Sequence, residues 1–362
     1  MGFELDRVVI ENWCRESELA RRVVRSLTPG VTVDYVEDAR GALRPSADAV
    51  DAFGAGKRRM VLMRRRAPFL MGCPAGSQQF ACCGYLVMVL GSNCPMDCSY
   101  CYLQEHLADN PTLQVYANYR DVFAELDRLN PAGRTLRIGT GEWADSLAFD
   151  SVTGISVELI EYFARRENLM LELKTKTVEI DNLLKVDPKD HTIVSWSLSP
   201  EAVYRSSEAG TAPPEGRMTA AAQVRAAGYR VAFHLDPMIA YERAEADYVG
   251  LLDRLFDRVD PAHISFVSMG GLRMTPGLRT AARRRFPRDP MLVGEEVLAA
   301  DGRYRTFAPL RLGLYRKLRD RIVRARPDLP VYLCMENAGV HRRVFELAPP
   351  SPAGIGARLL GA

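Results

Sequence analysis

The segment GSNCPMDCSYCYLQ (91–104) brings three cysteines together in a CxxxCxxC spacing: Cys94, Cys98 and Cys101. Thiolates are soft ligands that suit iron–sulfur clusters or zinc. A loop this short can place three sulfur atoms around one small site. Because a four-iron cluster needs one protein ligand per iron, three cysteines leave one iron open for a cofactor or a substrate. The segment therefore predicts a [4Fe–4S] cluster.

Zinc is the alternative metal for the same cysteines. A structural zinc site needs a fourth ligand, which His106 or Cys83 could supply, and its usual pattern is a pair of CxxC knuckles. The spacing in this loop is closer to the pattern of an iron–sulfur cluster, so we expect iron rather than zinc.

The cysteine segment directly follows the first of a series of strands that alternate with helices. Expected strands are 85–90, 135–140, 169–175, 191–198, 229–237, 263–270 and 331–336, with helices near 119–129, 154–166, 178–185, 216–227, 243–258 and 310–325. Alternating strands and helices indicate a parallel sheet, because each helix must return the chain across one face of the sheet. We therefore predict an α/β fold with a partial or full (β/α)₆ barrel, and a site at the carboxyl ends of its strands.

Three regions follow from this pattern. Residues 1–80 are predicted to form an N-terminal α/β extension, residues 81–345 the barrel, and residues 346–362 a loose C-terminal tail. Within the extension, the spacing of apolar residues predicts a helix over 16–27 and strands over 31–38 and 57–66. The last of these has basic residues on both sides, which is typical of an edge strand.

Composition restricts the class of protein. The chain has 362 residues, 47% of them hydrophobic, and a formal net charge of +3, which permits a nucleic-acid partner without arguing for one. It has no apolar run of about 18 residues and no signal-peptide pattern at its start, so we expect a cytoplasmic protein without a membrane partner. In that compartment the eight cysteines are expected to stay reduced. The basic runs 57–59, 64–66 and 283–285 could contact phosphates or be a solvated face.

At the cysteine segment the chain resembles the radical S-adenosylmethionine superfamily. That resemblance implies that the open iron binds the amino and carboxylate groups of S-adenosylmethionine. It also implies that one-electron reduction then yields a 5′-deoxyadenosyl radical that abstracts hydrogen. The electron would come from a partner of the flavodoxin or ferredoxin type.

A closer resemblance covers most of residues 80–336. The blocks CPMDCSYCYLQ, TKTVEIDNLL, WSLSPEAV, AAGYRVAFHLDPM and VYLCMEN resemble the spore photoproduct lyase family in order and spacing. Enzymes of that family split a methylene-bridged thymine dimer in DNA back to two thymines. The resemblance makes DNA a candidate partner and carbon–carbon bond cleavage the candidate reaction.

The resemblance also assigns roles to single residues. Tyr100 and Tyr102 match tyrosines associated with cofactor contact and hydrogen-atom return, and Lys176 matches a lysine that contacts the cofactor carboxylate. Ser197 matches a serine near the same group. Gly141 and Glu142 end the second strand, where such enzymes bind the methionine amino group.

One position departs from the family pattern. The lyases carry a hydrogen-donating cysteine after the second strand, and that position falls on Glu142 here. A carboxylate O–H bond is far too strong to quench a carbon radical, so another donor is needed or the reaction differs. Cys334, Cys82 and Cys83 are candidate donors; each could equally be a buried structural cysteine.

Two other functions remain open at this point. The first is a biosynthetic radical enzyme that acts on a free nucleoside or another small molecule, which the Glu142 departure and the modest charge favour somewhat. The second is a non-catalytic iron–sulfur sensor or nucleic-acid-binding protein.

Overall fold

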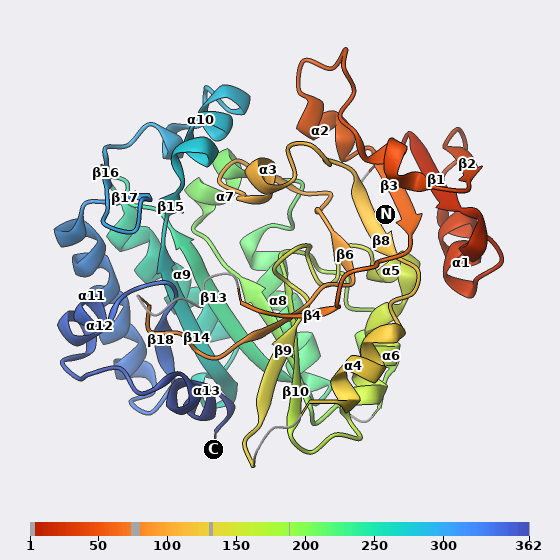
Figure 1. Ribbon diagram of the computed structural model, residues 1–362. Helices are drawn as coiled ribbons and strands as arrows, with labels where there is room; N and C mark the ends of the chain where they lie inside the picture. Colours follow the sequence, from red (N-terminus) through yellow and green to blue (C-terminus); the bar gives the residue numbers. More distant parts are fainter. Residues whose placement is uncertain (1–3, 74–79, 130–132, 188, 362) are drawn as a thin grey trace.

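The computed structural model describes residues 4–73, 80–129, 133–187 and 189–361. Parts of the expected N-terminal extension and the last residue of the expected tail therefore lie outside the described residues. Two sheets dominate the structure (Figure 1).

The larger sheet has eight strands in the order β18-β14-β13-β11-β10-β9-β5-β4. Its strands are β4 (Leu70–Gly72), β5 (Leu86–Met88), β9 (Leu136–Gly139), β10 (Leu169–Thr175), β11 (Thr192–Ser197), β13 (Arg230–Met238), β14 (Ile264–Gly271) and β18 (Val331–Leu333). All neighbours run parallel except β4, which pairs antiparallel with β5. The sheet curls into a half-barrel, so the predicted α/β barrel is confirmed in its partial form. Each of the seven expected barrel strands is present.

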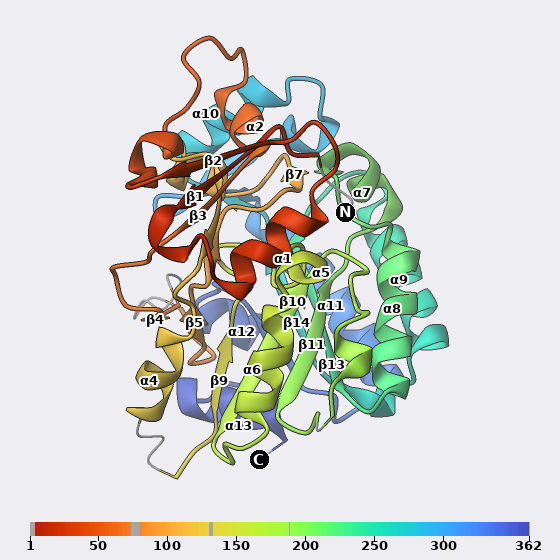
Figure 2. The ribbon, with the colours of Figure 1, turned by 90° about the vertical axis from the view of Figure 1, so that its right-hand side faces the viewer.

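Helices cover the outer face of this sheet, as the crossover connections of parallel strands require. They are α4 (Asp121–Asp127), α5 (Asp150–Thr153), α6 (Ile155–Phe163), α8 (Pro214–Ala226), α9 (Ala244–Arg258), α11 (Ala308–Ala325) and α12 (Ala338–Phe345). Figure 2 shows α6, α8 and α9 along the outside of the curved strands. Their apolar faces bury residues such as Phe163, Val224 and Leu251 against the sheet.

The helix expected over 178–185 is wrong, because only a short 3-10 turn, Leu183–Lys185, forms there. The hydroxyl groups of Thr175 and Thr177 accept hydrogen bonds from the backbone N–H groups of Thr177 and Glu179 at the start of this stretch. Such local side-chain bonds compete with a helix.

The smaller sheet has the order β2-β1-β3-β8-β6. Its strands are β1 (Arg7–Glu11), β2 (Thr32–Val36), β3 (Arg59–Met63), β6 (Gly91–Ser92) and β8 (Leu113–Tyr116), with helices α1 (Glu18–Ser26) and α2 (Ala52–Gly56). The expectation that 57–66 is an edge strand is wrong, since β3 lies in the middle of the sheet. Its residues Met60, Val61 and Leu62 are fully buried, and the basic residues that suggested an edge lie at or beyond the strand ends.

The last described residues are also more ordered than the sequence predicts. The expected loose tail contains helix α13 (Pro352–Leu360), which Ser351 caps through Gly354 N–H. Ile355, Leu359 and Leu360 are buried against the barrel, so an apolar helix face holds this segment in place.

The remaining elements gather where the barrel strands end. They are β7 (Asp97–Cys98), α3 (Leu103–His106), α7 (Glu201–Ser207), β12 (Glu208–Ala209), β15 (Arg273–Met274), α10 (Pro276–Arg285), β16 (Glu296–Leu298) and β17 (Tyr304–Thr306). Figure 1 shows α3, α7 and α10 together at the upper end of the sheet. Among the described residues, none of the helices combines the length and the apolar composition that a bilayer crossing needs.

Candidate active site

A cavity of about 340 Å³ opens at the carboxyl ends of the barrel strands. This is large enough for a cofactor-sized ligand, since such sites usually span about 300–1,000 Å³. The predicted residues in its wall are Cys94, Cys98, Tyr100, Cys101, Tyr102, Gly141, Glu142, Lys176 and Ser197. The structure therefore brings all predicted cluster ligands and cofactor contacts to one cavity.

The cysteine loop begins at Asn93, whose φ of 68° turns the chain out of β6. Asparagine tolerates this left-handed conformation better than most residues. Its side-chain oxygen accepts a hydrogen bond of 2.8 Å from Cys94 N–H, and its own N–H donates to Trp143 O at 2.8 Å. Lys57, although part of a basic run, is buried and donates to Met96 O inside the loop. The loop is thus fixed at its start and at Met96.

The surroundings of the cysteine side chains bear on the metal that they could hold. In the described chain, no three His, Cys, Asp or Glu side chains converge closely enough to hold one metal ion, as a zinc site would need. A four-iron cluster is larger and needs its thiolates further apart. Burial raises the pKa of the Cys98 thiol to about 12 and also raises that of Cys94. Thiols in such surroundings ionise when a metal compensates the charge, which suits ligands.

Lys176 lies at the end of β10 and reaches across the cavity wall to Glu208. Its Nζ donates to Tyr100 Oη and to Glu208 Oε1, each at 2.7 Å, and Tyr100 Oη donates to the same carboxylate oxygen. Burial opposes ionisation of Glu208, but Lys176 and Arg217 outweigh it and hold the pKa of that carboxyl below its usual range. The sequence analysis missed Glu208 and Arg217.

Glu142 is paired with a second lysine that the sequence analysis missed. Lys174 Nζ donates to Glu142 Oε1 at 2.7 Å. Tyr102 Oη donates to the backbone oxygen of Glu142 at 2.6 Å. A Cβ on Gly141 would lie 2.7 Å from the Cβ of Lys174, so only glycine fits this approach of the two strand ends. Burial raises the pKa of Tyr102 well above its usual value, so the phenol keeps its hydrogen.

Asp145, which also lines the active-site cavity, holds the loop that follows β9. Its carboxylate accepts hydrogen bonds from Thr175 Oγ1 and from the N–H groups of Lys176, Leu147 and Ala148, all between 2.8 and 3.0 Å. Asp145 therefore fixes the backbone that carries Lys176.

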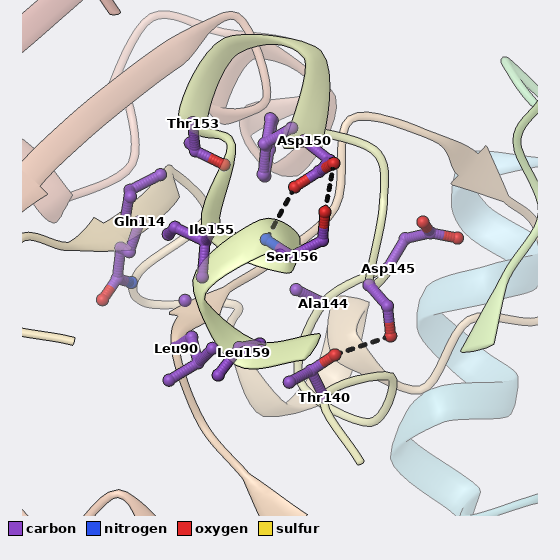
Figure 3. Close-up of a pocket in the computed structure, with 14 residues that line it drawn as sticks. Leu90, Gln114, Thr140, Ala144, Asp145, Asp150, Thr153, Ile155, Ser156 and Leu159 are labelled. Atoms are coloured by element: carbon purple, nitrogen blue, oxygen red, sulfur yellow. Dashed lines mark hydrogen bonds between the residues drawn. The ribbon is translucent and has the colours of Figure 1, made fainter. Parts of the chain in front are cut away.

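A smaller cavity of about 60 Å³ lies behind this loop, between the two sheets (Figure 3). Thr140 Oγ1 donates to Ser146 Oγ at 2.7 Å, and Ser156 donates to Asp150 through both its N–H and its hydroxyl. These bonds fix the loop between β9 and α6 from its rear side.

Cysteines outside the cluster loop differ in their surroundings. Cys73 lines the cavity, a position that the sequence analysis did not consider. Cys334 immediately precedes Met335, another wall residue, and burial raises its pKa well above the usual value. Cys83 accepts a hydrogen bond of 2.8 Å from Arg137 Nη2. A hydrogen bond from Cys82, together with Arg137, lowers the pKa of the Cys83 thiol below its usual value.

Most residues of the basic runs are engaged within the protein. Arg58 pairs with Asp6, and Arg285 pairs with Asp51 and Asp97. At the cavity wall, Arg273 forms a bidentate pair with Asp236, at 3.0 and 3.1 Å. Arg303 also lines the cavity.

A parallel half-barrel with a three-cysteine loop and a lysine-containing cavity at the carboxyl ends of its strands defines a radical S-adenosylmethionine enzyme. The sequence model of the family "Spore photoproduct lyase" matches residues 64–306. The chain belongs to the spore photoproduct lyase family.

Known relatives agree with this assignment. The chain is 24% identical to the spore photoproduct lyase of Clostridium acetobutylicum over 80% of this chain and 85% of that protein. It is 25% identical to that of Bacillus subtilis over 57% of this chain and 61% of that protein.

Two solved structures share the fold. A spore photoproduct lyase complexed with dinucleoside spore photoproduct has a TM-score of 0.80 at 22% identity, over 92% of this chain and 100% of that one. A variant with bound S-adenosylmethionine and the same dinucleoside has a TM-score of 0.78 at 22% identity, over 92% of this chain and 99% of that one.

Proposed function

We propose that this protein repairs the methylene-bridged thymine photoproduct in DNA. The observation that carries the proposal is the shared cavity, which the three cysteines line together with the lysine and the serine that match cofactor contacts in the family. A related structure of the same fold holds the dinucleoside photoproduct, which supports a substrate of that class.

Cys94, Cys98 and Cys101 would hold the [4Fe–4S] cluster, and Lys176, Ser197, Gly141 and Glu142 would hold S-adenosylmethionine. When bound, these groups supply a 5′-deoxyadenosyl radical that abstracts a hydrogen atom. The cavity residues would orient both ligands and exclude water. The electron would come from a flavodoxin or ferredoxin in the cytoplasm, where the cluster thiols stay reduced.

Tyr100 and Tyr102 have different surroundings, and we assign them different roles. The hydroxyl of Tyr100 is held by Glu208 and Lys176, which suits a cofactor contact. Tyr102 keeps its neutral phenol in the wall beside Glu142, which suits hydrogen-atom return.

The Glu142 carboxylate is paired with Lys174 and has no weakly bound hydrogen to give, so we propose that a thiol supplies the hydrogen atom that quenches the substrate radical. The sequence offers Cys334, Cys82 and Cys83 for this step, and the position of Cys73 in the cavity wall makes Cys73 the stronger candidate. In that step the S–H bond breaks and the new C–H bond forms. The thiyl radical then takes the hydrogen atom of the Tyr102 hydroxyl, and the resulting tyrosyl radical takes one back from the methyl group of 5′-deoxyadenosine.

The substrate can be tested by comparing three compounds under anaerobic conditions with dithionite and S-adenosylmethionine: dinucleoside spore photoproduct, undamaged thymine dinucleoside and free thymidine. DNA repair predicts that formation of 5′-deoxyadenosine coupled to substrate conversion requires the photoproduct. Conversion of the free nucleoside instead would favour the biosynthetic alternative.

Binding of lesion-containing duplex DNA adds an independent test. Phosphate contacts make such binding fall steeply between about 50 and 200 mM salt. A lack of DNA affinity at about 50 mM salt would argue against a DNA substrate.

A further inference from the structure

We propose that Glu208 is a positioning residue that joins the cysteine loop to Lys176 and so holds the cofactor-binding lysine at a fixed distance from the cluster. This inference rests on the proposed function, and it concerns a residue outside the motifs that the sequence analysis used.

The side chain of Glu208 has four donors around it and is fully buried. Lys176 Nζ and Ser199 Oγ donate to Oε1 at 2.7 and 2.8 Å, and Tyr100 Oη donates to the same oxygen. Arg217 Nη2 donates to Oε2 at 2.5 Å. Such a fully satisfied buried carboxylate has one stable orientation.

The backbone of Glu208 holds the cysteine loop at the same time. Strand β12 pairs antiparallel with β7, and Glu208 lies opposite Cys98 in that pairing. One residue further on, Ser99 N–H donates to Ser207 O at 2.9 Å. One residue thus contacts a cluster ligand through its backbone and the cofactor lysine through its side chain.

Arg217 extends the connection to the end of β11. This fully buried side chain donates to Ser197 O at 2.8 Å and to Ala212 O at 2.7 Å in addition to Glu208. The cysteine loop, the end of β10 and the end of β11 are therefore tied to one buried ion pair.

The consequence for Lys176 follows from its donor count. An ammonium group has three N–H donors. Two of them point at Glu208 and Tyr100, which leaves one for a carboxylate in the cavity. Without the Glu208 carboxylate, the long lysine side chain would sample other rotamers, and its cation would no longer be fixed relative to the cluster.

The test is the Glu208→Gln variant, which keeps the shape of the side chain and removes its charge. Binding of S-adenosylmethionine to the anaerobically reconstituted protein is measured by equilibrium dialysis. The change that S-adenosylmethionine causes in the electron paramagnetic resonance spectrum of the reduced cluster is recorded in parallel. We expect binding to weaken by about 10- to 100-fold, the usual effect of removing the partner of a ligand-binding group. We also expect a smaller spectral change.

A double-mutant cycle separates positioning from a general structural effect. If Glu208 acts through Lys176, the double variant Glu208→Gln with Lys176→Met binds S-adenosylmethionine no more weakly than Lys176→Met alone.

Glu11→Gln is the matched control, because Glu11 is a buried glutamate of the smaller sheet that accepts hydrogen bonds from Trp13 Nε1 and from the backbone N–H of Arg64. It should leave binding unchanged.

Loss of the carboxylate could leave Arg217 as an unpaired buried cation and prevent folding. The double variant Glu208→Gln with Arg217→Met removes that cation as well, and loss of both charges of a buried ion pair is tolerated much better than loss of one. It should show the same weakened binding. Wild-type affinity in either folded Glu208 variant, or additive effects with Lys176→Met, would overturn the proposal. Failure of the wild-type protein to bind S-adenosylmethionine would instead refute the proposed function.

Discussion

The carboxylate of Glu142 accepts a hydrogen bond of 2.7 Å from Lys174 Nζ at the wall of the active-site cavity. The family resemblance aligns Glu142 with the hydrogen-donating cysteine of the spore photoproduct lyases. A carboxylate in an ion pair cannot donate a hydrogen atom, so we propose that a different side chain quenches the substrate radical.

Cys73 is the proposed donor of the hydrogen atom that quenches the substrate radical. Cys73→Ser is expected to lower the yield of repaired dinucleoside at least about tenfold, a loss of roughly 1.4 kcal/mol in transition-state stabilisation. Formation of 5′-deoxyadenosine should continue, because the thiol acts after hydrogen abstraction. Chromatography of both products measures this. Cys334→Ser is the matched comparison, and a loss confined to that variant would move the role to Cys334.

The Glu142–Lys174 pair should also contribute to stability. Glu142→Gln leaves a largely buried ammonium group without its anion, and we expect a loss of about 1–3 kcal/mol in the free energy of unfolding. The loss of stability should lie near the lower end of this range, because the side chains of Glu142 and Lys174 are both about a quarter exposed. Urea titration measures it. Glu201→Gln breaks an exposed pair with Arg205 and should have little effect; equal losses in the two variants would contradict a special role for Glu142.

The Asp236–Arg273 pair should make the free energy of unfolding depend on pH in the acidic range. Burial raises the pKa of Asp236, but Arg273 outweighs burial and lowers it below its usual value. Its ionised form therefore stabilises the folded state above about pH 4, the ordinary pKa of aspartate, and that contribution is lost as the pH falls through the lower folded value. The difference in unfolding free energy between wild type and Asp236→Asn should shrink over this range. A difference that stays constant from pH 7 to pH 2 would refute the linkage.

Gly141 should tolerate no side chain. In Gly141→Ala the new Cβ would lie 2.7 Å from Lys174 Cβ and 3.1 Å from Lys174 O. We expect a cost of about 1–3 kcal/mol, shared between stability and binding of S-adenosylmethionine. Calorimetric melting and equilibrium dialysis measure the two parts. Gly41→Ala is the control, since a Cβ there would meet open space. Unchanged melting and binding in Gly141→Ala would show that the strand ends separate easily.

The sequence predicts the barrel well because its strands are apolar segments of the expected length between amphipathic helices. The family resemblance assigns Lys176 and Ser197 to the cofactor, and the structure places both in one cavity because parallel topology brings strand ends to the same edge. The edge assignment of β3 failed, because flanking charges do not show which strands pair on either side. The prediction of a helix over 178–185 failed because the hydroxyl groups of Thr175 and Thr177 form hydrogen bonds with the local backbone.

The residues that the sequence analysis missed depend on tertiary contacts. Glu208 follows a short helix without any motif, and only the pairing of β12 with β7 brings it to the cysteine loop. Arg217 lies on an ordinary helix, α8, and its burial beside Glu208 has no periodic signal. Cys73 belongs to no cysteine spacing, and only the curl of the sheet places it at the cavity.

The proposed function requires that Cys94, Cys98 and Cys101 hold a [4Fe–4S] cluster that drives cleavage of the thymine photoproduct. The most direct test follows iron and sulfide content, the spectrum of the reduced cluster and photoproduct conversion in anaerobic wild-type protein and in each single Cys→Ala variant. We predict about four iron and four sulfide per chain and conversion to two thymines in the wild type. Each variant should lose both the cluster spectrum and conversion. Wild-type protein that carries the cluster and leaves the photoproduct intact, or a variant that still converts it, would contradict the account.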